Sequence, residues 1–284
     1  MKFFYYLANF CYYVFFIFSA NQKIPYSKIE LFLNYLKLQF KYLFFVVLLK
    51  RKILKERLFN FQISLLDYSS FICMFEEIFI RRIYYFKAMT KSPLIYDCGS
   101  HIGIALIFFK MLYPKSRIFA FEPDKSAFSL LELNVNSNKL SDVLLFRQIL
   151  SNKEGLVKFY FNPENLSSAS KSIISERNSK SIVFERLPSV KLSAYIKGKI
   201  DFLKMDIEGA EGLVMSELSK KHKLSFVREA VVEFHHHIDS WKDDFSDFLN
   251  IFEKNGFGYQ IRSTPKMPFT KKQFQDILIY AYKK

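Results

Sequence analysis

The order of apolar segments predicts an α/β fold, with a mostly parallel, doubly wound sheet in residues 91–284. From Pro93 onward, short apolar runs alternate with longer amphipathic ones, a rhythm typical of strands that alternate with helices. All eight glycines lie at or after Gly99, and a glycine turn follows the first of these strands. Only one proline, Pro25, precedes Pro93, so residues 1–90 predict an α-helical N-terminal extension.

The composition is that of a globular protein with a basic balance. Half of the 284 residues are apolar, so the chain can bury a sizeable core. The net charge of +15 indicates either an anionic partner or a solvated basic face. Residues 1–90 hold 13 basic and 5 acidic residues, so their net charge is 13 − 5 = +8. Cys11, Cys73 and Cys98 form neither a metal-ligand pair nor a disulfide framework, which fits a cytoplasmic location.

The N-terminal extension is expected to form several helices, with breaks near residues 21–27 and 67–70. Residues 3–20 contain no charge, and their length makes them a marginal candidate for a membrane anchor. Four tyrosines in this stretch argue against a span, because tyrosine prefers the membrane interface to the bilayer centre. The alternative is a helical subdomain packed on the rest of the chain or on a second subunit.

A second apolar run, residues 42–49, is too short to span a bilayer. Lys50, Arg51 and Lys52 follow it directly. Basic residues beside an apolar, aromatic face suit a helix that lies on an anionic membrane. Residues 1–57 are therefore a candidate surface for an anionic membrane, and packing within the protein is the alternative.

A glycine turn follows the first predicted strand of the C-terminal domain. Residues 94–96 form this strand, Asp97 closes it, and a helix is expected over residues 102–113. Gly99 allows a sharp turn, and Gly103 allows the helix start to approach a ligand closely. The spacing differs from the G-x-G-x-x-G of dinucleotide-binding loops. A carboxylate at this strand end suits the ammonium group of an amino-acid ligand, although a glycine turn after a strand is also a common structural device.

The second predicted strand, residues 117–122, ends in another acid. Glu122 stands 122 − 97 = 25 residues after Asp97. In a β-α-β unit, an acid at the end of the second strand can accept both ribose hydroxyls of an adenosine. A charge at the start of the following helix is the structural alternative. The two strand-end acids at this separation favour a nucleoside-type cofactor.

A further strand, residues 200–206, leads into a segment with three acids. If the sheet is doubly wound, this strand lies beside the first one, at the crevice where ligands bind. Asp206 stands at the strand end and is the best functional candidate, and Glu208 follows it in the turn. Glu211 is expected only to complement the dipole of the next helix.

Residues 230–237 predict a strand that runs into a loop. Strand alternation would place Glu233, His235 and His237 on one face and His236 on the other. A histidine at this strand edge, with His235 as the candidate, can deprotonate a hydroxyl group. A metal site is conceivable, since histidine and carboxylate ligands are present. No metal is expected, however, and a polar strand end with surface histidines is the structural alternative.

The remaining strands complete the predicted domain. Residues 143–148 should form the third strand, whose end passes near the adenine. Residues 258–261 and 277–282 should form a closing antiparallel pair. The insertion between Gly155 and Lys191 is rich in Ser, Asn and Lys and is interpreted as a lid over the substrate or as a mobile surface loop.

Several of these segments are similar to one protein family. The matching segments are 77–79 with 84–86, 96–103, 113–123 and 203–211, with 233–235 as a weaker match. In them the chain resembles the FkbM family of S-adenosylmethionine-dependent methyltransferases over roughly residues 76–237. The phrase Lys-Met-Asp-Ile-Glu-Gly-Ala-Glu at 204–211 is the most specific part of the resemblance.

The resemblance implies a class I Rossmann-like methyltransferase fold with S-adenosylmethionine as the cofactor. It implies cofactor-binding roles for Asp97, Gly99, Gly103 and Glu122, and an active-site role for Asp206. Characterised members of the family methylate hydroxyl groups of sugars or polyketides.

The chain departs from the family pattern at two places. The family usually has Ala-Asn where this chain has Ser100-His101, and it often has Leu-Asp where this chain has Leu192-Ser193. Neither change removes an acid on which the predicted site depends.

We therefore expect an O-methyltransferase that acts on a hydroxyl group of a sugar, glycan or other small molecule, with Asp206, Glu208 and His235 as its catalytic residues. The net charge invites a nucleic-acid methyltransferase as the alternative. Amino-group methyltransferases of that kind usually carry an Asn/Asp-Pro-Pro-aromatic motif, whereas residues 206–209 are Asp-Ile-Glu-Gly. A non-catalytic membrane-bound module that has kept the fold is the third hypothesis, and the intact strand-end acids argue against it.

Overall fold

The computed structural model describes residues 2–19, 24–162, 171–175, 183–238, 243–263, 268, 270–271 and 273–284. The chain divides into two compact units. The N-terminal unit comprises Met1–Tyr85, Ile102–Pro114 and Ser129–Leu140, and the sheet unit comprises Phe86–His101, Lys115–Phe128 and Ser141–Lys284. The predicted division of the chain near residue 90 stays a prediction.

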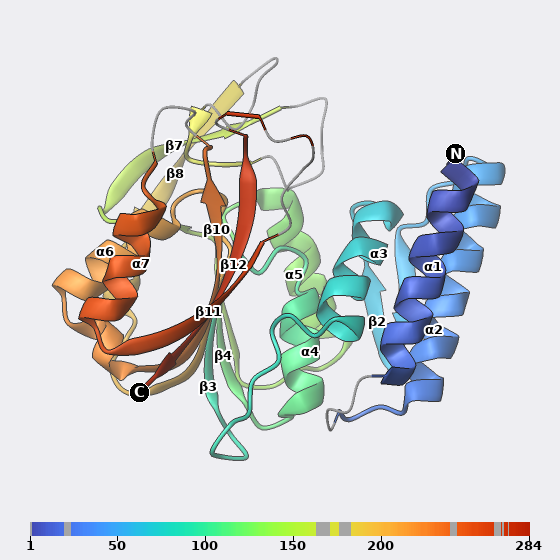
Figure 1. Ribbon diagram of the computed structural model, residues 1–284, viewed down its shortest axis with the longest axis horizontal. Helices are drawn as coiled ribbons and strands as arrows, with labels where there is room; N and C mark the ends of the chain where they lie inside the picture. The colour runs from blue at the N-terminus through green and yellow to red at the C-terminus, as the bar shows by residue number, and fades with distance from the viewer. Residues whose placement is uncertain are drawn as a thin grey trace. The chain divides into compact units, whose positions relative to one another are not determined.

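The sheet unit is built on a seven-stranded sheet with the strand order β11-β12-β10-β9-β3-β4-β5 (Figure 1). The strands are β3 (Leu94–Cys98), β4 (Arg117–Phe121), β5 (Val143–Phe146), β9 (Ile200–Met205), β10 (Val227–His236), β11 (Phe257–Ser263) and β12 (Gln275–Lys283). Five neighbouring strands, β10, β9, β3, β4 and β5, are parallel. β12 runs antiparallel to both β10 and β11. The doubly wound sheet and its C-terminal antiparallel hairpin are therefore confirmed.

Two helices of the sheet unit pack beside each other on one face of the sheet (Figure 1). They are α6 (Glu211–Lys220) and α7 (Phe245–Lys254), and short 3-10 turns lie at Leu192–Ala194 and Lys223–Phe226. The core beneath them is rich in fully buried aromatic side chains, including Tyr96, Phe121, Phe252 and Phe257. This apolar layer holds the parallel strands in register and so positions their carboxyl ends.

The insertion predicted as a lid or loop contains a second, smaller sheet. Strands β6 (Ile149–Leu150), β7 (Gly155–Phe161) and β8 (Val183–Val190) form it in the order β6-β8-β7. The alternating pattern of β8 supports this pairing, because Leu187 and Ser189 are buried while their neighbours along the strand are not. Residues 163–170 and 176–182 of the predicted lid lie outside the described residues.

The N-terminal unit is mainly helical. Its elements are α1 (Lys2–Ser19), α2 (Lys28–Lys41), the π-helical η1 (Tyr42–Leu48), α3 (Tyr68–Phe75), the π-helical η2 (Glu76–Ile80), α4 (Ile104–Leu112) and most of α5 (Lys125–Ser137). The two predicted breaks coincide with helix starts, because the Ser27 hydroxyl accepts from Glu30 N and the Asp67 carboxylate accepts from Ser70 N.

The expectation that residues 1–90 contain only helices was wrong at one place. β1 (Lys55–Leu58) and β2 (Phe61–Ser64) form an antiparallel hairpin whose turn includes Phe59 at φ +51°. The free edge of β2 is covered by two asparagines of α5. Asn138 bonds both backbone groups of Gln62, and Asn134 bonds both of Ser64. These contacts reach across about 70 residues of sequence, so local pattern did not reveal them.

One helical stretch near the N-terminus, Lys28–Leu48, is long and apolar enough to cross a membrane by length and composition. It is 21 residues long, because α2 continues into η1 without a break. The apolar residues 42–48 are therefore the end of a longer helix rather than a separate run. Within residues 3–20, the expected candidate for an anchor, the part with described side chains includes the shorter apolar helix Ala8–Ser19.

Candidate active site

Four parallel strands bring the predicted site residues to one edge of the sheet. β4, β3, β9 and β10 lie next to one another in this order and run in the same direction, so their carboxyl ends meet. Asp97 lies in β3, and Glu122 directly follows β4. Asp206 directly follows β9, and His235 is the penultimate residue of β10. Open α/β sheets bind their ligands at this edge, at the point where the strand order reverses.

Asp97 is completely buried and faces the ammonium group of Lys204. Lys204 Nζ lies 3.4 Å from Asp97 Oδ1 and 3.7 Å from Asp206 Oδ2, and it donates to the carbonyl of Gly99. Burial alone would lower the pKa of Lys204, but the carboxylates of Asp97 and Asp206 raise it above its ordinary value. Its raised pKa favours the charged ammonium form of Lys204, which links the end of β9 to the glycine turn.

The oxygens of Asp97 accept no hydrogen bond within the part of the chain that the structure describes. A buried acceptor without a donor destabilises the folded protein by about 1–3 kcal/mol. The position therefore suits a ligand that brings its own N–H donors. Sequence reasoning had missed the role of Lys204, although strand alternation places it on the same side of β9 as Asp206.

The turn after β3 requires glycine. Gly99 has φ +84°, and a Cβ atom there would lie 1.7 Å from the carbonyl oxygen of Asp206. The N–H groups of Gly99 and Ser100 both donate to the carbonyl of Phe121 at 2.9 Å. The turn is thereby tied to the ends of β4 and β9. Gly103 belongs to the N-terminal unit, where it precedes α4 with φ +88° and a Cβ atom would lie 2.7 Å from Leu131 Cδ1.

Glu122 is buried and held by two backbone donors. His101 N donates to Oε2 at 2.8 Å, and Asp124 N donates to Oε1 at 2.9 Å. Burial raises the pKa of Glu122 to about 7, although the two backbone hydrogen bonds oppose that rise. His101 has φ +51°, a conformation that asparagine adopts more readily than most residues. Its backbone N–H makes the contact with Glu122, so this contact does not depend on the side chain at position 101.

His235 is the centre of a cluster of acids. Its Nε2 lies 3.4 Å from Glu208 Oε2, and 3.9 Å from oxygens of both Asp206 and Asp276. Its Nδ1 contacts Glu211 Oε1 at 3.0 Å. Burial alone would lower the pKa of His235, but Glu211, Glu208 and Asp206 raise it to about 10. The structure thus brings all three predicted catalytic residues together, and the acids around His235 favour its protonated form at neutral pH.

Glu211 does more than complement a helix dipole. It is the first residue of α6, as expected, but it is buried and its carboxylate accepts from the backbone N–H groups of Ile207 and Gly209. The same carboxylate contacts His235, so Glu211 fixes both the loop that carries Glu208 and the orientation of the imidazole ring. Its position four residues after Ile207 was the available signal, because a carboxylate there can reach back to cap its own turn.

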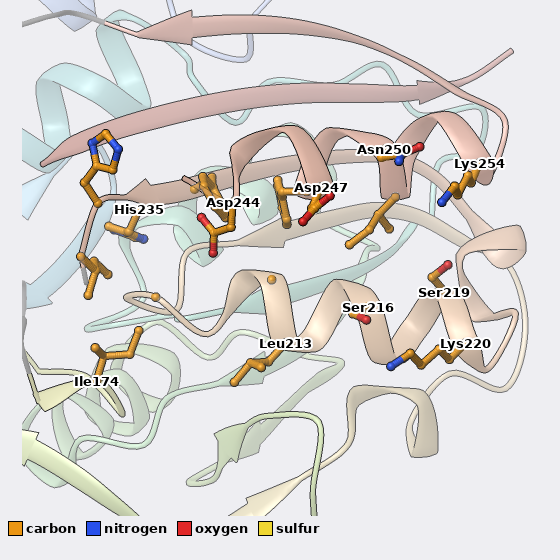
Figure 2. A pocket seen from close by; sticks show the side chains of 17 residues that line it. Ile174, Leu213, Ser216, Ser219, Lys220, His235, Asp244, Asp247, Asn250 and Lys254 are labelled. Atoms are coloured by element: carbon orange, nitrogen blue, oxygen red, sulfur yellow. The ribbon is translucent and has the colours of Figure 1, made fainter. Parts of the chain in front are cut away.

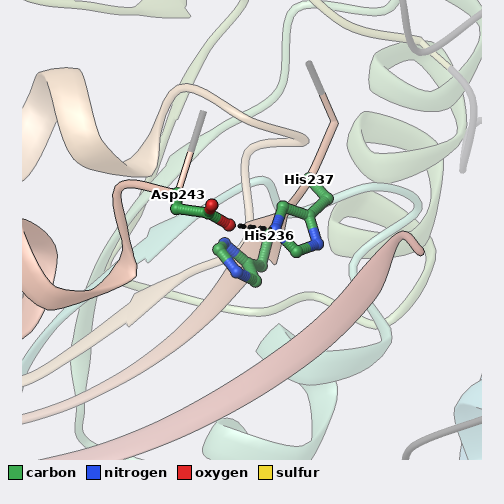
Figure 3. A group of neighbouring side chains, drawn as sticks. All are labelled: His236, His237 and Asp243. Atoms are coloured by element: carbon green, nitrogen blue, oxygen red, sulfur yellow. Dashed lines mark hydrogen bonds and ion pairs between the residues drawn. The ribbon is translucent and has the colours of Figure 1, made fainter. Parts of the chain in front are cut away.

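Glu233 and His235 lie on the same face of β10, as predicted, and their side chains approach Asp276 of β12. His237 departs from the predicted alternation because the strand ends at His236 and His237 has φ +58°. Its ring stacks on that of His236 with 3.7 Å between centroids, and its Nε2 lies 2.6 Å from Asp243 Oδ1 (Figure 3).

Among the described residues, three sets of donors at this end of the sheet are close enough to share one metal ion: Asp206, Glu208 and His235; Glu233, His235 and Asp276; and His236, His237 and Asp243. A proton on His235 already supplies a positive charge among these acids. The expectation of a metal-free site stays a prediction.

A cleft of about 700 Å³ opens from His235 along the groove between α6 and α7 (Figure 2). Leu213, Phe234 and Ile251 are among its apolar lining residues. Lys220 and Lys254 stand at the end far from His235, on the last turns of α6 and α7 (Figure 2). Asp244, Asp247 and Asn250 also line it, so the cleft connects the acid cluster with a space of mixed apolar and polar lining that ends in two lysines.

The strand order, the antiparallel β12 and the acids at the ends of β3 and β4 define a class I Rossmann-like methyltransferase. The chain belongs to the FkbM methyltransferase family, whose model, the methyltransferase FkbM domain, matches residues 97–259. The predicted family, fold and methyltransferase class are thus confirmed.

Two curated relatives carry methyltransferase names. The chain is 29% identical over 209 residues to methyltransferase sdnD of Sordaria araneosa, which covers 63% of this chain and 79% of that protein. It is 27% identical over 205 residues to methyltransferase 1 of Beauveria bassiana (strain ARSEF 2860), which covers 66% of this chain and 80% of that protein. A crystal structure of the methyltransferase FkbM from Methylobacillus flagellatus KT superposes with a TM-score of 0.44 and 18% identity, over 68% of this chain and 44% of that one.

Proposed function

We propose that this protein transfers a methyl group from S-adenosylmethionine to a hydroxyl group of a small molecule or glycan. The observation that carries the proposal is the pair of buried strand-end acids beside the glycine turn. In the described structure the buried oxygens of Asp97 accept no hydrogen bond of normal geometry and face the Lys204 ammonium at 3.4 Å, and Glu122 stands one strand away with its carboxylate held in place by backbone N–H groups. An ammonium group and a ribose diol are the donors that such a pair suits.

The residues present fit S-adenosylmethionine in three respects. Asp97 can accept from the ammonium group of its methionine part, Gly99 lets the backbone approach it, and Glu122 can accept from the ribose hydroxyls. When bound, S-adenosylmethionine supplies an electrophilic methyl group on a sulfonium ion. The protein's part is to position the acceptor oxygen behind that methyl group, and positioning of this kind supplies roughly 7–11 kcal/mol of a barrier.

Asp206 is the base that this arrangement favours for removing the hydroxyl proton. It directly follows β9, its backbone N–H donates to Cys98 O next to the glycine turn, and its side chain is partly accessible. Glu211, Glu208 and Asp206 raise the pKa of His235 to about 10, which favours the protonated imidazole at neutral pH and makes it the weaker candidate for the base. It instead holds the carboxylates of Asp206 and Glu208 in place. General base catalysis contributes roughly 10²–10⁴-fold to such rates.

The acids around His235 argue against a nucleic-acid substrate. Asp206, Glu208 and Asp276 present negative charge where a phosphate backbone would have to lie. The cleft between α6 and α7 has both apolar and polar lining groups, which suits a small acceptor with an apolar body and hydroxyl groups.

Calorimetry with S-adenosylmethionine and S-adenosylhomocysteine tests the cofactor assignment. Asp97→Ala and Glu122→Ala should each weaken binding about 10- to 100-fold, because each removes a charge-assisted hydrogen bond worth roughly 1.5–3 kcal/mol. Glu154→Gln, at an exposed acid, is the matched control. Absence of binding by the wild type would overturn the proposal, and unchanged binding by both variants would show that the site is misplaced.

Transfer of a radiolabelled methyl group to a panel of alcohols, glycans and tRNA tests the reaction. Asp206→Asn should keep cofactor binding but lower transfer by about 10²-fold or more, because the base is lost. Labelling of tRNA rather than of alcohols would replace the proposed substrate class.

A further inference from the structure

The helical stretch Lys28–Leu48 has two opposite apolar faces. Leu31, Tyr35 and Leu38 form the buried one. The other is exposed to solvent and consists of Ile29, Leu33, Phe40, Leu43, Phe44, Val47 and Leu48. Within α2, at about 100° per residue, Ile29, Leu33 and Phe40 lie roughly 180° from the buried set. Phe40 and Leu48 are 62% and 67% exposed, so the second face has no cover within the described structure. Soluble proteins rarely expose an apolar surface of this extent without a partner.

A basic cluster adjoins the exposed face directly. Lys50, Arg51, Lys52 and Lys55 are all exposed, and they follow the exposed Val47 and Leu48 within a few residues. Only two acids, Glu30 and Glu56, occur in residues 1–57. Glu56 is buried and neutralised, because Lys41 Nζ lies 2.9 Å from its Oε2 and Lys37 Nζ lies 3.3 Å from its Oε1. The surface that faces solvent here is therefore apolar and positively charged.

The buried face of the helix is fixed by polar contacts within the N-terminal unit. Tyr35 Oη donates to Glu76 Oε1 at 3.2 Å, and Gln39 Nε2 donates to the same oxygen at 3.1 Å. Lys41 is bound to Glu56 of the hairpin. A helix inserted across a bilayer would have to break these contacts and bury their polar groups in hydrocarbon. The arrangement suits a helix that lies parallel to a membrane surface with one face immersed.

We propose that the exposed face of Lys28–Leu48, together with the basic residues 50–55, binds the surface of an anionic phospholipid bilayer. The apolar side chains would enter the acyl boundary, while the lysines and arginine meet the lipid phosphates. Charge favours lipid over a second copy of this chain, because a self-complementary interface would bring the same basic clusters together. This inference is independent of the proposed reaction, since it concerns residues outside the candidate active site.

Flotation of the full-length protein with vesicles tests the proposal. The protein should float with phosphatidylcholine vesicles that contain about one third phosphatidylserine, and markedly less with pure phosphatidylcholine. Binding should also weaken as salt rises toward 1 M, where the screening length falls to about 3 Å. Flotation that ignores both lipid charge and salt, or none at all, would overturn the proposal.

Paired variants separate the apolar and basic contributions. Phe40→Ser with Leu48→Ser should reduce vesicle binding at least about tenfold, because two immersed side chains are lost. Met89→Ser with Leu156→Ser is the matched control, since those side chains are 77% and 69% exposed elsewhere in the chain, and it should bind like the wild type. Lys50→Glu with Lys52→Glu should remove the preference for anionic lipid.

The Phe40→Ser/Leu48→Ser variant should keep the fold and the mass of the wild type. Its binding of S-adenosylhomocysteine and its far-ultraviolet circular dichroism spectrum should be unchanged, which shows that it is folded. Light scattering after size exclusion should give the same mass for that variant and the wild type. A wild-type dimer that this variant converts to a monomer would overturn the proposal in favour of a second copy as the occupant.

Discussion

The buried surroundings of Glu122 disfavour the ionised form of its carboxyl group. Burial raises its pKa to about 7, so near neutrality it is only partly ionised before a ligand binds. Ribose hydroxyls donate hydrogen bonds, and therefore they bind the ionised form more strongly. Cofactor binding at this residue is thus coupled to the release of a proton.

This coupling predicts that cofactor affinity rises with pH. Between pH 6 and 8 the dissociation constant for S-adenosylhomocysteine should fall, by up to about tenfold per pH unit below the pKa. Glu122→Gln should bind more weakly and lose most of that dependence, which calorimetry at three pH values can measure. Comparison with this variant also separates the titration of Glu122 from the titration of the ligand. A wild-type affinity that follows the variant's pH dependence would contradict the assignment.

The raised pKa of Glu122 also makes the stability of the ligand-free protein depend on pH. The pKa of Glu122 is raised from 4.5 in the unfolded chain to about 7 in the folded protein, so the folded state holds the proton more tightly. Its contribution to stability is fully present below about pH 4.5 and is lost as pH rises through about 7. Glu122→Gln should therefore gain stability relative to the wild type as pH rises through this window.

Glu211 and His235 form a buried pair that should be sensitive to loss of one charge. Glu211→Gln removes the carboxylate that contributes most to raising the pKa of His235, so this pKa should fall from about 10. Nitrogen NMR of the imidazole can follow this titration. The variant should also be destabilised by about 3–5 kcal/mol, because a buried partner is left uncompensated. Glu253→Gln, at an exposed acid that accepts from Tyr259, is the control.

At the scale of elements, the turn after β3 is the piece that ties the site together. It contacts β4 through the Phe121 carbonyl and β9 through Lys204, so three strand ends are held by one loop. Backbone hydrogen bonds make most of these contacts. The turn therefore constrains position 99 by space and by φ rather than by side-chain chemistry.

Gly99→Ala should disrupt both folding and cofactor binding. The new Cβ would lie 1.7 Å from a backbone oxygen, which no side-chain adjustment can relieve. We expect a loss of about 3 kcal/mol or more in chemical denaturation and no measurable cofactor affinity. Gly198→Ala is the matched control, since nothing lies within 4 Å of a Cβ there. Normal binding by Gly99→Ala would contradict the described turn.

At the scale of the whole molecule, the two acids that we propose to bind the cofactor belong to the same compact unit. Asp97 and Glu122 both lie in the sheet unit. S-adenosylhomocysteine at a hundredfold excess over its dissociation constant should therefore stabilise that unit by about 2.7 kcal/mol. Scanning calorimetry should show the shift in the transition that includes the sheet unit. The Asp97→Ala/Glu122→Ala double variant at the same ligand concentration should not show it, and an equal shift in both proteins would argue for binding elsewhere.

Local pattern was sufficient for the sheet and for most acids of the site. Strands end where apolar runs end, and parallel strands must bring those ends to one edge, so Asp97, Glu122 and Asp206 could be placed from order alone. The hairpin at residues 55–64 could not be placed in this way, because its free edge is satisfied by Asn134 and Asn138 from a distant helix. The role of Lys204 was missed for a similar reason, since its partner Asp97 lies on another strand.

The sequence by itself determined the methyltransferase family, the order of secondary structure in the sheet and which acids stand at the strand ends. The family follows from the resemblance of short motifs, above all residues 204–211, and the strand order and strand-end acids follow from short-range periodicity and spacing, which survive in any compact arrangement of the chain. Only the tertiary structure decided the charge state of His235, the central part played by Glu211 and which face of Lys28–Leu48 remains uncovered. Each of those depends on burial and on partners far away in the chain, and burial is the quantity that sets both a pKa and an exposed apolar surface.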